Sequence, residues 1–115
     1  MSVTIETIQK EDKQILVVRG HVDAAAAEQL AGALQQAIAA SARCVIVDLG
    51  QNGFLDSSGL GTLVHALRAA RDAHVELILA DLARPVMVLL QMTGLDRVFT
   101  TYPSVAEAVR ATRIL

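Results

Sequence analysis

The sequence predicts an α/β fold in which a mixed sheet of four to five strands packs against about four helices. Short runs rich in Val, Ile and Leu alternate along the chain with segments whose apolar residues recur at helical spacing. The first two strand-like runs follow one another directly, whereas each later run comes after a helix, which predicts an antiparallel start and parallel strands thereafter. The expected order is β-β-α-β-α-β-α-β-α in one domain over residues 1–115, because 115 residues suit a single domain.

The N-terminal part of the chain predicts a hairpin followed by a helix. Polar and apolar residues alternate over residues 3–7 and again over 15–17, on either side of a polar turn at 10–13. Gly20 ends the second strand, and Asp23 precedes an alanine-rich stretch for which it can serve as the helix N-cap. Three apolar residues give this first helix one core face: Leu30, Leu34 and Ile38.

The rest of the chain alternates strands and helices. Residues 45–49 are apolar at nearly every position, which is typical of a strand buried on both sides. Pro85 suits the first turn of a helix, Gly94 suits a helix end, and Ser104 suits an N-cap. The remaining elements are a helix over 57–73, a strand over 75–80, a helix over 86–92, a short strand within 95–100 and a helix over 105–112.

Composition and charge exclude several classes of protein. The chain is 53% hydrophobic but only 3% aromatic, so its core is built from Leu, Ile, Val and Ala. Because the net charge is −2 and no basic stripe exists, we expect no binding to nucleic acid. No run approaches the roughly 18 apolar residues of a membrane-spanning helix, and the N-terminus does not have the pattern of a signal peptide. We therefore expect a cytoplasmic protein without membrane insertion.

The single cysteine, Cys44, opens the strand pattern of the fully buried type. It has no second cysteine with which to form an internal disulfide, in agreement with a cytoplasmic protein. We expect it to be a small core residue rather than a reactive thiol.

The most informative segment is Phe-Leu-Asp-Ser-Ser-Gly-Leu-Gly over residues 54–61, which joins a strand to a helix. Its two hydroxyls lie where a loop becomes a helix, and free backbone N–H groups and the helix dipole favour oxygen and negative charge there. Ser57 can be the N-cap of the helix, a phosphoacceptor, or both. Asp56 is either a cap or a residue that positions Ser57 at a kinase, and Ser58 is expected to bond to the first-turn backbone. The two glycines let another backbone come close or allow a tight entry into the helix.

Enzymatic and metal chemistry have little support in the sequence. The serines do not lie in the Gly-x-Ser-x-Gly motif of serine hydrolases, because Leu55 and Asp56 stand where the first glycine would be. The spacing of the glycines fits neither the P-loop nor the dinucleotide-binding fingerprint. We therefore expect no enzyme, no cofactor and no metal. The enzyme hypothesis kept as an alternative is a serine hydrolase acting through Ser57 or Ser58, which reaction with an activated phosphonate would support. Three histidines without metal-ligand spacing are interpreted as surface residues: His21, His65 and His74.

The motif and its surroundings resemble a STAS domain, specifically a bacterial anti-sigma factor antagonist. Residues 20–23, Gly-His-Val-Asp, are similar to the family's Gly-Glu-Leu-Asp before the first helix. The strand at 45–49 and the motif at 54–61 follow in the family's order. The match continues at the third helix and its exit, over residues 85–86 and 92–95 and at Phe99. The resemblance covers essentially the whole chain and implies the STAS fold.

The resemblance also implies a non-enzymatic switch protein. In this family an anti-sigma factor that is also a serine kinase phosphorylates the serine after the motif aspartate, here Ser57. The unphosphorylated antagonist binds the anti-sigma factor and frees the sigma factor for transcription. Phosphorylation releases the antagonist, and a phosphatase resets it, so that ATP is a substrate of the partner and not of this chain. The residues implied to contact the partner are Asp23, Asp56, Ser58, Gly59, Leu60 and Leu89.

Asp23 and Leu60, like the motif residues above, keep a second interpretation. Asp23 serves equally well as a simple N-cap, and Leu60, in the first turn of its helix, is a core residue by default. The chain also departs from the family at His21, where glutamate is usual, so the identity of its partner can differ.

The third helix is a further departure because residues 86–90 are all apolar. Five successive apolar residues cannot all face one side of a helix. Some of Met87, Val88 and Leu90 must therefore face outward or be covered by the C-terminal segment, and an exposed set would form an interaction patch or the surface of a homodimer.

The alternative function is a STAS module that works without phosphorylation. It would be the small cytoplasmic subunit of a lipid-transport ABC system, or a scaffold in a larger signalling assembly. Co-purification with the ATPase subunit of a transporter would favour this alternative.

Overall fold

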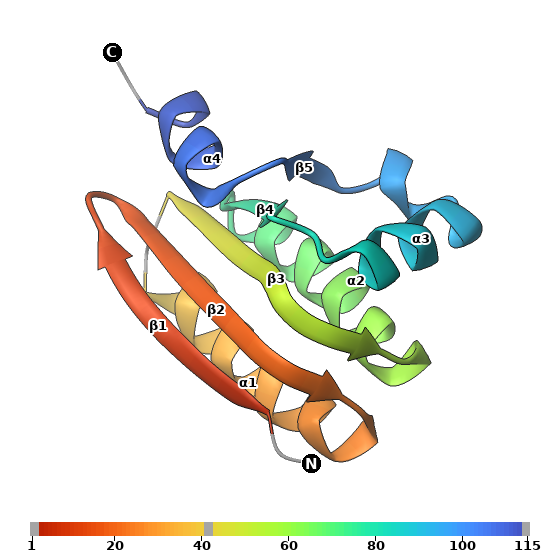
Figure 1. The fold of residues 1–115 in the computed structure, drawn as a ribbon. Coiled ribbons are helices and arrows are strands. Elements are labelled where there is room, and N and C mark those ends of the chain that lie inside the picture. Colours follow the sequence, from red (N-terminus) through yellow and green to blue (C-terminus); the bar gives the residue numbers. More distant parts are fainter. Residues whose placement is uncertain (1–2, 41–42, 114–115) are drawn as a thin grey trace.

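A five-stranded mixed sheet in the order β1-β2-β3-β4-β5 forms the centre of the computed structural model, which describes residues 3–40 and 43–113 (Figure 1). The antiparallel start and parallel continuation predicted from the sequence are confirmed, because β1 pairs antiparallel with β2 and every later pair is parallel. Residues 1–2, 41–42 and 114–115 of the predicted domain lie outside the described residues. The strands are β1 (Thr4–Lys10), β2 (Lys13–Val22), β3 (Cys44–Leu55), β4 (Glu76–Ala80) and β5 (Thr100–Tyr102).

Helices cover both faces of this sheet, but unequally. One face packs against the first three helices through a core built from aliphatic residues. The opposite face carries a smaller core, in which the buried helical residues among those described are Ala108 and Val109 of the C-terminal helix. The helices are α1 (Ala24–Ala39), α2 (Ser57–Asp72), α3 (Arg84–Thr93) and α4 (Val105–Ala111), with a 3₁₀ turn, η1 (Leu95–Arg97), after α3.

The last strand lies further along the chain than predicted. Residues 95–97 form η1 instead of a strand, and β5 spans Thr100–Tyr102. Gly94 explains the difference, because its φ of 75° ends α3 in the left-handed conformation and turns the chain into the 3₁₀ turn.

The central strand β3 is buried on both sides, as predicted. Val45 and Val47 belong to the core under α1 and α2, whereas Cys44 and Ile46 belong to the core on the opposite face. The interpretation of Cys44 as a core residue is confirmed, since it is fully buried. Burial raises the pKa of its thiol to about 11, so the nucleophilic thiolate is scarce at neutral pH.

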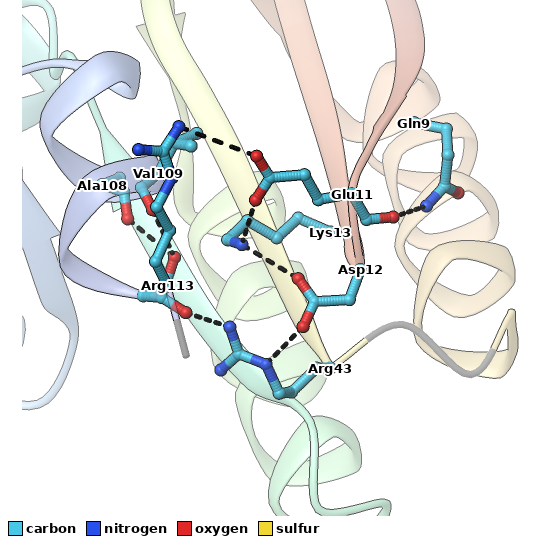
Figure 2. A network of polar contacts seen from close by, with 9 residues as sticks. Gln9, Glu11, Asp12, Lys13, Arg43, Ala108, Val109 and Arg113 are labelled. Carbon is cyan, nitrogen blue, oxygen red and sulfur yellow. Dashed lines mark hydrogen bonds and ion pairs between the residues drawn. The ribbon is translucent and has the colours of Figure 1, made fainter. Parts of the chain in front are cut away.

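A network of ion pairs anchors the turn between β1 and β2 (Figure 2). The side chain of Lys13 is 1% exposed, and its ammonium group contacts the carboxylate of Asp12 at 2.9 Å and that of Glu11 at 3.4 Å. Arg43, just before β3, contacts Asp12 at 2.6 Å and also donates to the backbone carbonyl of Thr112 after α4. The network therefore joins the N-terminal hairpin, β3 and the C-terminal helix.

This network predicts how the stability of the fold depends on pH. Hydrogen bonds from Lys13 and Arg43 lower the pKa of Asp12 to about 2, below the value of about 3.9 expected in the unfolded chain. The stabilisation is therefore fully present above pH 4 and is lost as the pH falls toward 2. We expect Asp12→Asn to lower the free energy of unfolding at pH 7, with a difference from wild type that shrinks between pH 4 and pH 2.

Urea unfolding at a series of pH values measures this difference. Asp72→Asn is the matched control, because Asp72 is exposed and forms no ion pair with a described residue. A difference between Asp12→Asn and wild type that stays constant across this pH range would contradict the role of the Asp12 carboxylate.

Candidate functional site

The motif segment passes from β3 into α2 with one residue, Asp56, between the two elements. A carboxylate oxygen of Asp56 accepts a hydrogen bond from the backbone N–H of Gly59 at 3.0 Å, and its carbonyl accepts from Leu60 at 2.9 Å. Asp56 is therefore the N-cap, and the interpretation of Ser57 as the cap is wrong. The loop expected before the helix is also absent, because β3 continues to Leu55.

Ser57 and Ser58 occupy the first two positions of α2, and both are exposed. Backbone N–H groups at these positions have no acceptor within a helix. The expected bond between the Ser58 hydroxyl and the first-turn backbone does not form within the described residues, because Asp56 already accepts from the N–H of Gly59. Instead the hydroxyl of Thr62 donates to the carbonyl of Ser58 at 3.0 Å.

The N-terminus of α1 lies beside that of α2 at the same edge of the sheet (Figure 1). Asp23 is the N-cap of α1, and its carboxylate accepts from the backbone N–H of Ala26 at 2.9 Å. The N–H of Asp56 donates to the carbonyl of Val22 at 3.2 Å, which ties the two helix starts together. Two positive dipole ends therefore meet next to Ser57, a place that favours an anion such as a phosphate.

A buried asparagine, which the sequence analysis missed, fixes this alignment of the two helix starts. The side-chain amide of Asn52 is fully buried and donates to the carbonyls of Gly20 and Phe54, each at 2.8 Å. The pairing of β2 with β3 shifts register next to these residues, which brings Val22 opposite Leu55. The sequence offers one indication of this role, since Asn52 lies between the apolar run at 45–49 and the apolar residues Phe54 and Leu55. The nearby glycines, however, are typical of a loop.

The two glycines of the motif have different surroundings. A Cβ atom on Gly59 would lie 2.5 Å from Cδ1 of Leu55 and 2.8 Å from Cγ1 of Val22, so α2 packs on the sheet at a distance that only glycine allows. Gly59 is buried, so the structure gives it a packing role, and its direct contact with a partner stays a prediction. A Cβ atom on the exposed Gly61 would meet nothing within 4 Å.

The family profile of the STAS domain matches residues 4–108. The chain belongs to the STAS domain family. An anti-sigma-B factor antagonist of Listeria monocytogenes is 30% identical over 97 residues, which are 84% of this chain and 85% of that protein.

Solved structures show the same fold. A crystal structure of an anti-sigma factor antagonist from Mycobacterium paratuberculosis has a TM-score of 0.85 at 24% identity and covers 97% of this chain and 95% of that one. The Bacillus cell fate determinant SpoIIAA in its phosphorylated form has a TM-score of 0.74 at 21% identity, with 96% and 100% of the two chains covered.

In this STAS domain, two further predicted contact residues are partly exposed. Leu60 is half-buried and, together with Ser57, Val64 and Leu95, lines a hollow of about 470 Å³ between α2 and η1. Leu89 is half-buried on α3, whose start is tied to the middle of β3 by a hydrogen bond from the N–H of Ala83 to the carbonyl of Leu49. The structure thus brings Asp23, Asp56, Ser57, Ser58 and Leu60 to neighbouring helix starts and places Leu89 on a third helix.

The apolar third helix of this STAS domain has an exposed side, which is the first of the two alternatives that its sequence left open. Leu90 is fully buried, whereas Met87 and Val88 are 43% and 40% exposed. Met92, also on α3, is 80% exposed, which the sequence analysis did not single out. Of the three residues that were candidates to face outward, only Met87 and Val88 do so.

His21, the departure from the usual STAS pattern, packs against the aromatic ring of Phe54. The two ring centroids lie 5.9 Å apart, and both residues are exposed. His65 and His74 are exposed as well, so all three histidines are surface residues as predicted. Within residues 3–40 and 43–113, no three His, Cys, Asp or Glu side chains are placed to hold a metal ion, and no helix has the length and apolar character needed to span a membrane.

Proposed function

We propose that this chain is an anti-sigma factor antagonist that works by partner switching, controlled by phosphorylation of Ser57. The observation that carries the proposal is the exposed Ser57 hydroxyl at the first position of α2, beside the start of α1. The curated relative from Listeria is an anti-sigma-B factor antagonist, and SpoIIAA, which shares the fold, has been solved in a phosphorylated form.

The unphosphorylated protein binds its partner through the surface around Ser57. The contact residues are the two capping aspartates, Asp23 and Asp56, the hydroxyl of Ser58, and the partly exposed Leu60 and Leu89. Gly59 acts from beneath this surface by letting α2 approach the sheet. A neutral hydroxyl and half-exposed leucines are inexpensive to desolvate, which suits the centre of an interface.

Phosphorylation would disrupt this interface without unfolding the chain that carries it. A phosphate adds about −1.5 to −2 charge at pH 7 and lies at a helix N-terminus, where the dipole stabilises it. In the complex, however, the same charge must lose water or face a surface matched to a neutral hydroxyl. The carboxylates of Asp23 and Asp56 add to the negative charge at this edge, so the phosphorylated surface repels any acidic group of the partner.

The partner in this proposal is an anti-sigma factor with serine kinase activity, which uses ATP, and a phosphatase restores the free hydroxyl. The chain itself binds no cofactor and catalyses no reaction. Its site of action is the cytoplasm, where a sigma factor directs transcription.

Mapping of the modified serine tests the proposal. We expect an extract of the source cells supplied with ATP to phosphorylate the wild-type protein at Ser57, as read by mass spectrometry of its peptides. Ser58→Ala should still be modified and Ser57→Ala should not, which makes the adjacent serine the matched control. On immobilised variants, an ATP-binding serine kinase should be retained by Ser57→Ala and lost from Ser57→Asp. Modification at Ser58 alone, or no modification at all, would contradict the proposal.

The exposed apolar side of α3 favours an alternative, a STAS module held permanently in a larger assembly. Met87, Val88 and Met92 leave apolar surface that a lasting partner would cover. In that case the same transporter subunit or scaffold would be retained by both Ser57 variants.

A further inference from the structure

The outer edge of β1 is a long, regular strand edge that pairs with no described element (Figure 1). Its seven residues pair with β2 without interruption from Thr4 to Lys10, and they include no proline. Exposed edges of this kind are templates for pairing with another chain, and proteins usually shorten, kink or cover them. The opposite edge, β5, follows that rule because it has only three residues.

The hairpin geometry determines which backbone groups face outward. Only Glu11 and Asp12 connect the strands, so the closing pair Lys10 and Lys13 is of the hydrogen-bonded type. Bonded and non-bonded pairs alternate along an antiparallel ladder, so the even-numbered residues of β1 bond to β2. The N–H and C=O groups of three odd-numbered residues then point to the free edge: Ile5, Thr7 and Gln9.

We propose that two copies of this chain associate through antiparallel pairing of their β1 strands, with Ile8 opposite Ile8 of the second copy. In this register Glu6 of each copy lies opposite Lys10 of the other, so two opposite-charge pairs flank the isoleucines. All three residues are exposed, and Ile8 is 40% exposed. Thr7 and Gln9, whose backbone groups point outward, then form the hydrogen-bonded pairs, so the charge pattern and the ladder geometry require the same register.

Neighbouring registers lose this complementarity. A shift of two residues one way places Ile8 opposite Glu6 and leaves Lys10 without a carboxylate. A shift of two residues the other way places Glu6 opposite Asp12, a pair of like charges. The sequence of β1 therefore specifies one two-fold symmetric pairing.

The charges already present at the two ends of β1 suit this arrangement. Lys10 forms no ion pair with a described residue and lines a hollow together with Arg110 and Arg113, so this end of the strand is basic. Glu6 contacts Arg19 at 3.1 Å through one carboxylate oxygen, and its second oxygen remains available as an acceptor. A carboxylate from the second copy is therefore favoured next to Lys10.

The pairing would continue the sheet from one copy into the next and leave both Ser57 hydroxyls accessible, because Ser57 follows β3, which β2 separates from β1. The contact involves little more than one strand from each copy, so its buried area is far below the roughly 1,200 Å² of a stable interface. We therefore expect weak association, with a dissociation constant on the order of 100 μM.

Charge reversal tests the proposal by sedimentation equilibrium over a series of concentrations. Each of Glu6→Lys and Lys10→Glu places like charges opposite each other twice, so self-association should weaken at least tenfold, which is about 1.4 kcal/mol. An equimolar mixture of the two variants should restore it, because every pair across the two-fold axis is then of opposite charge. Glu28→Lys, on the exposed side of α1, is the control for net charge and should associate like wild type.

The possible outcomes either support the proposed pairing or overturn it. Restored association in the mixture, together with weakening in each variant alone, supports pairing in this register. A wild-type protein that remains monomeric at millimolar concentration would overturn the proposal, as would variants that associate like wild type or a mixture that does not recover. None of these results bears on phosphorylation of Ser57.

Discussion

Ser57→Asp is expected to weaken binding to the anti-sigma factor by about 100-fold, because a charge buried without a partner costs about 2–5 kcal/mol at an interface. Ser57→Ala should bind as tightly as wild type, since a neutral side chain of similar size needs no such desolvation. Calorimetry with the purified partner measures both affinities.

Ser57→Asn is the matched control for this experiment, because asparagine has the shape of aspartate without its charge. We expect Asn to weaken binding far less than Asp does. The stability of Ser57→Asp should change in the opposite direction and rise by about 0.3–1 kcal/mol, because a carboxylate in the first turn of α2 interacts favourably with the helix dipole. Equal losses of affinity for Asn and Asp would mean that size, and not charge, determines recognition at this position.

Gly59→Ala is expected to destabilise the fold by about 1–3 kcal/mol, the usual cost of forcing an additional group into a packed core. The added methyl would overlap Leu55 of β3 and Val22 of β2, and both are buried strand residues. Helix propensity favours alanine over glycine by about 1 kcal/mol, so the steric cost must exceed that gain. Urea unfolding measures the balance.

Gly61→Ala provides the matched control two residues later on the same helix. Its methyl group would meet nothing within 4 Å, so only the gain in helix propensity remains. We expect Gly61→Ala to be as stable as wild type or up to about 1 kcal/mol more stable. If both variants lost stability equally, the contact between α2 and the sheet would not be the reason why glycine is required at position 59.

Most of the fold could be predicted because each element carries its own periodicity. The predicted boundaries of the elements were wrong where a long-range contact overrides a local conformational preference. Gly50, Asn52 and Gly53 favour turns, yet pairing with β2 and the two bonds of the Asn52 amide keep this segment within β3. Asp56 and Ser57 are adjacent residues that can both cap a helix, and only the path of β3 places Asp56 at that position.

Less of the candidate site than of the fold could be predicted from the local sequence. Asp23 and Ser57 lie far apart in the chain, and a register shift between β2 and β3 brings their helices together. The burial of Gly59 depends on Val22, from a different strand, which no local pattern indicates. The choice of Met87 and Val88 over Leu90 as the exposed residues of α3 depends in the same way on where the helix meets the sheet.

The direct junction between β3 and α2 has a consequence for the enzymes that would modify this chain. Ser57 belongs to a helical turn held by the Asp56 cap and by a packed glycine, and not to a pliable loop. A kinase or phosphatase must therefore recognise the folded surface, or wait for the first turn of α2 to unwind. A short synthetic peptide with the residues of the motif has neither the cap nor the neighbouring helix. It would therefore be a poor substrate for an enzyme that recognises the folded surface and a good substrate for one that acts on the unwound turn. In the second case, a variant whose first turn of α2 is more stable would be both phosphorylated and dephosphorylated more slowly.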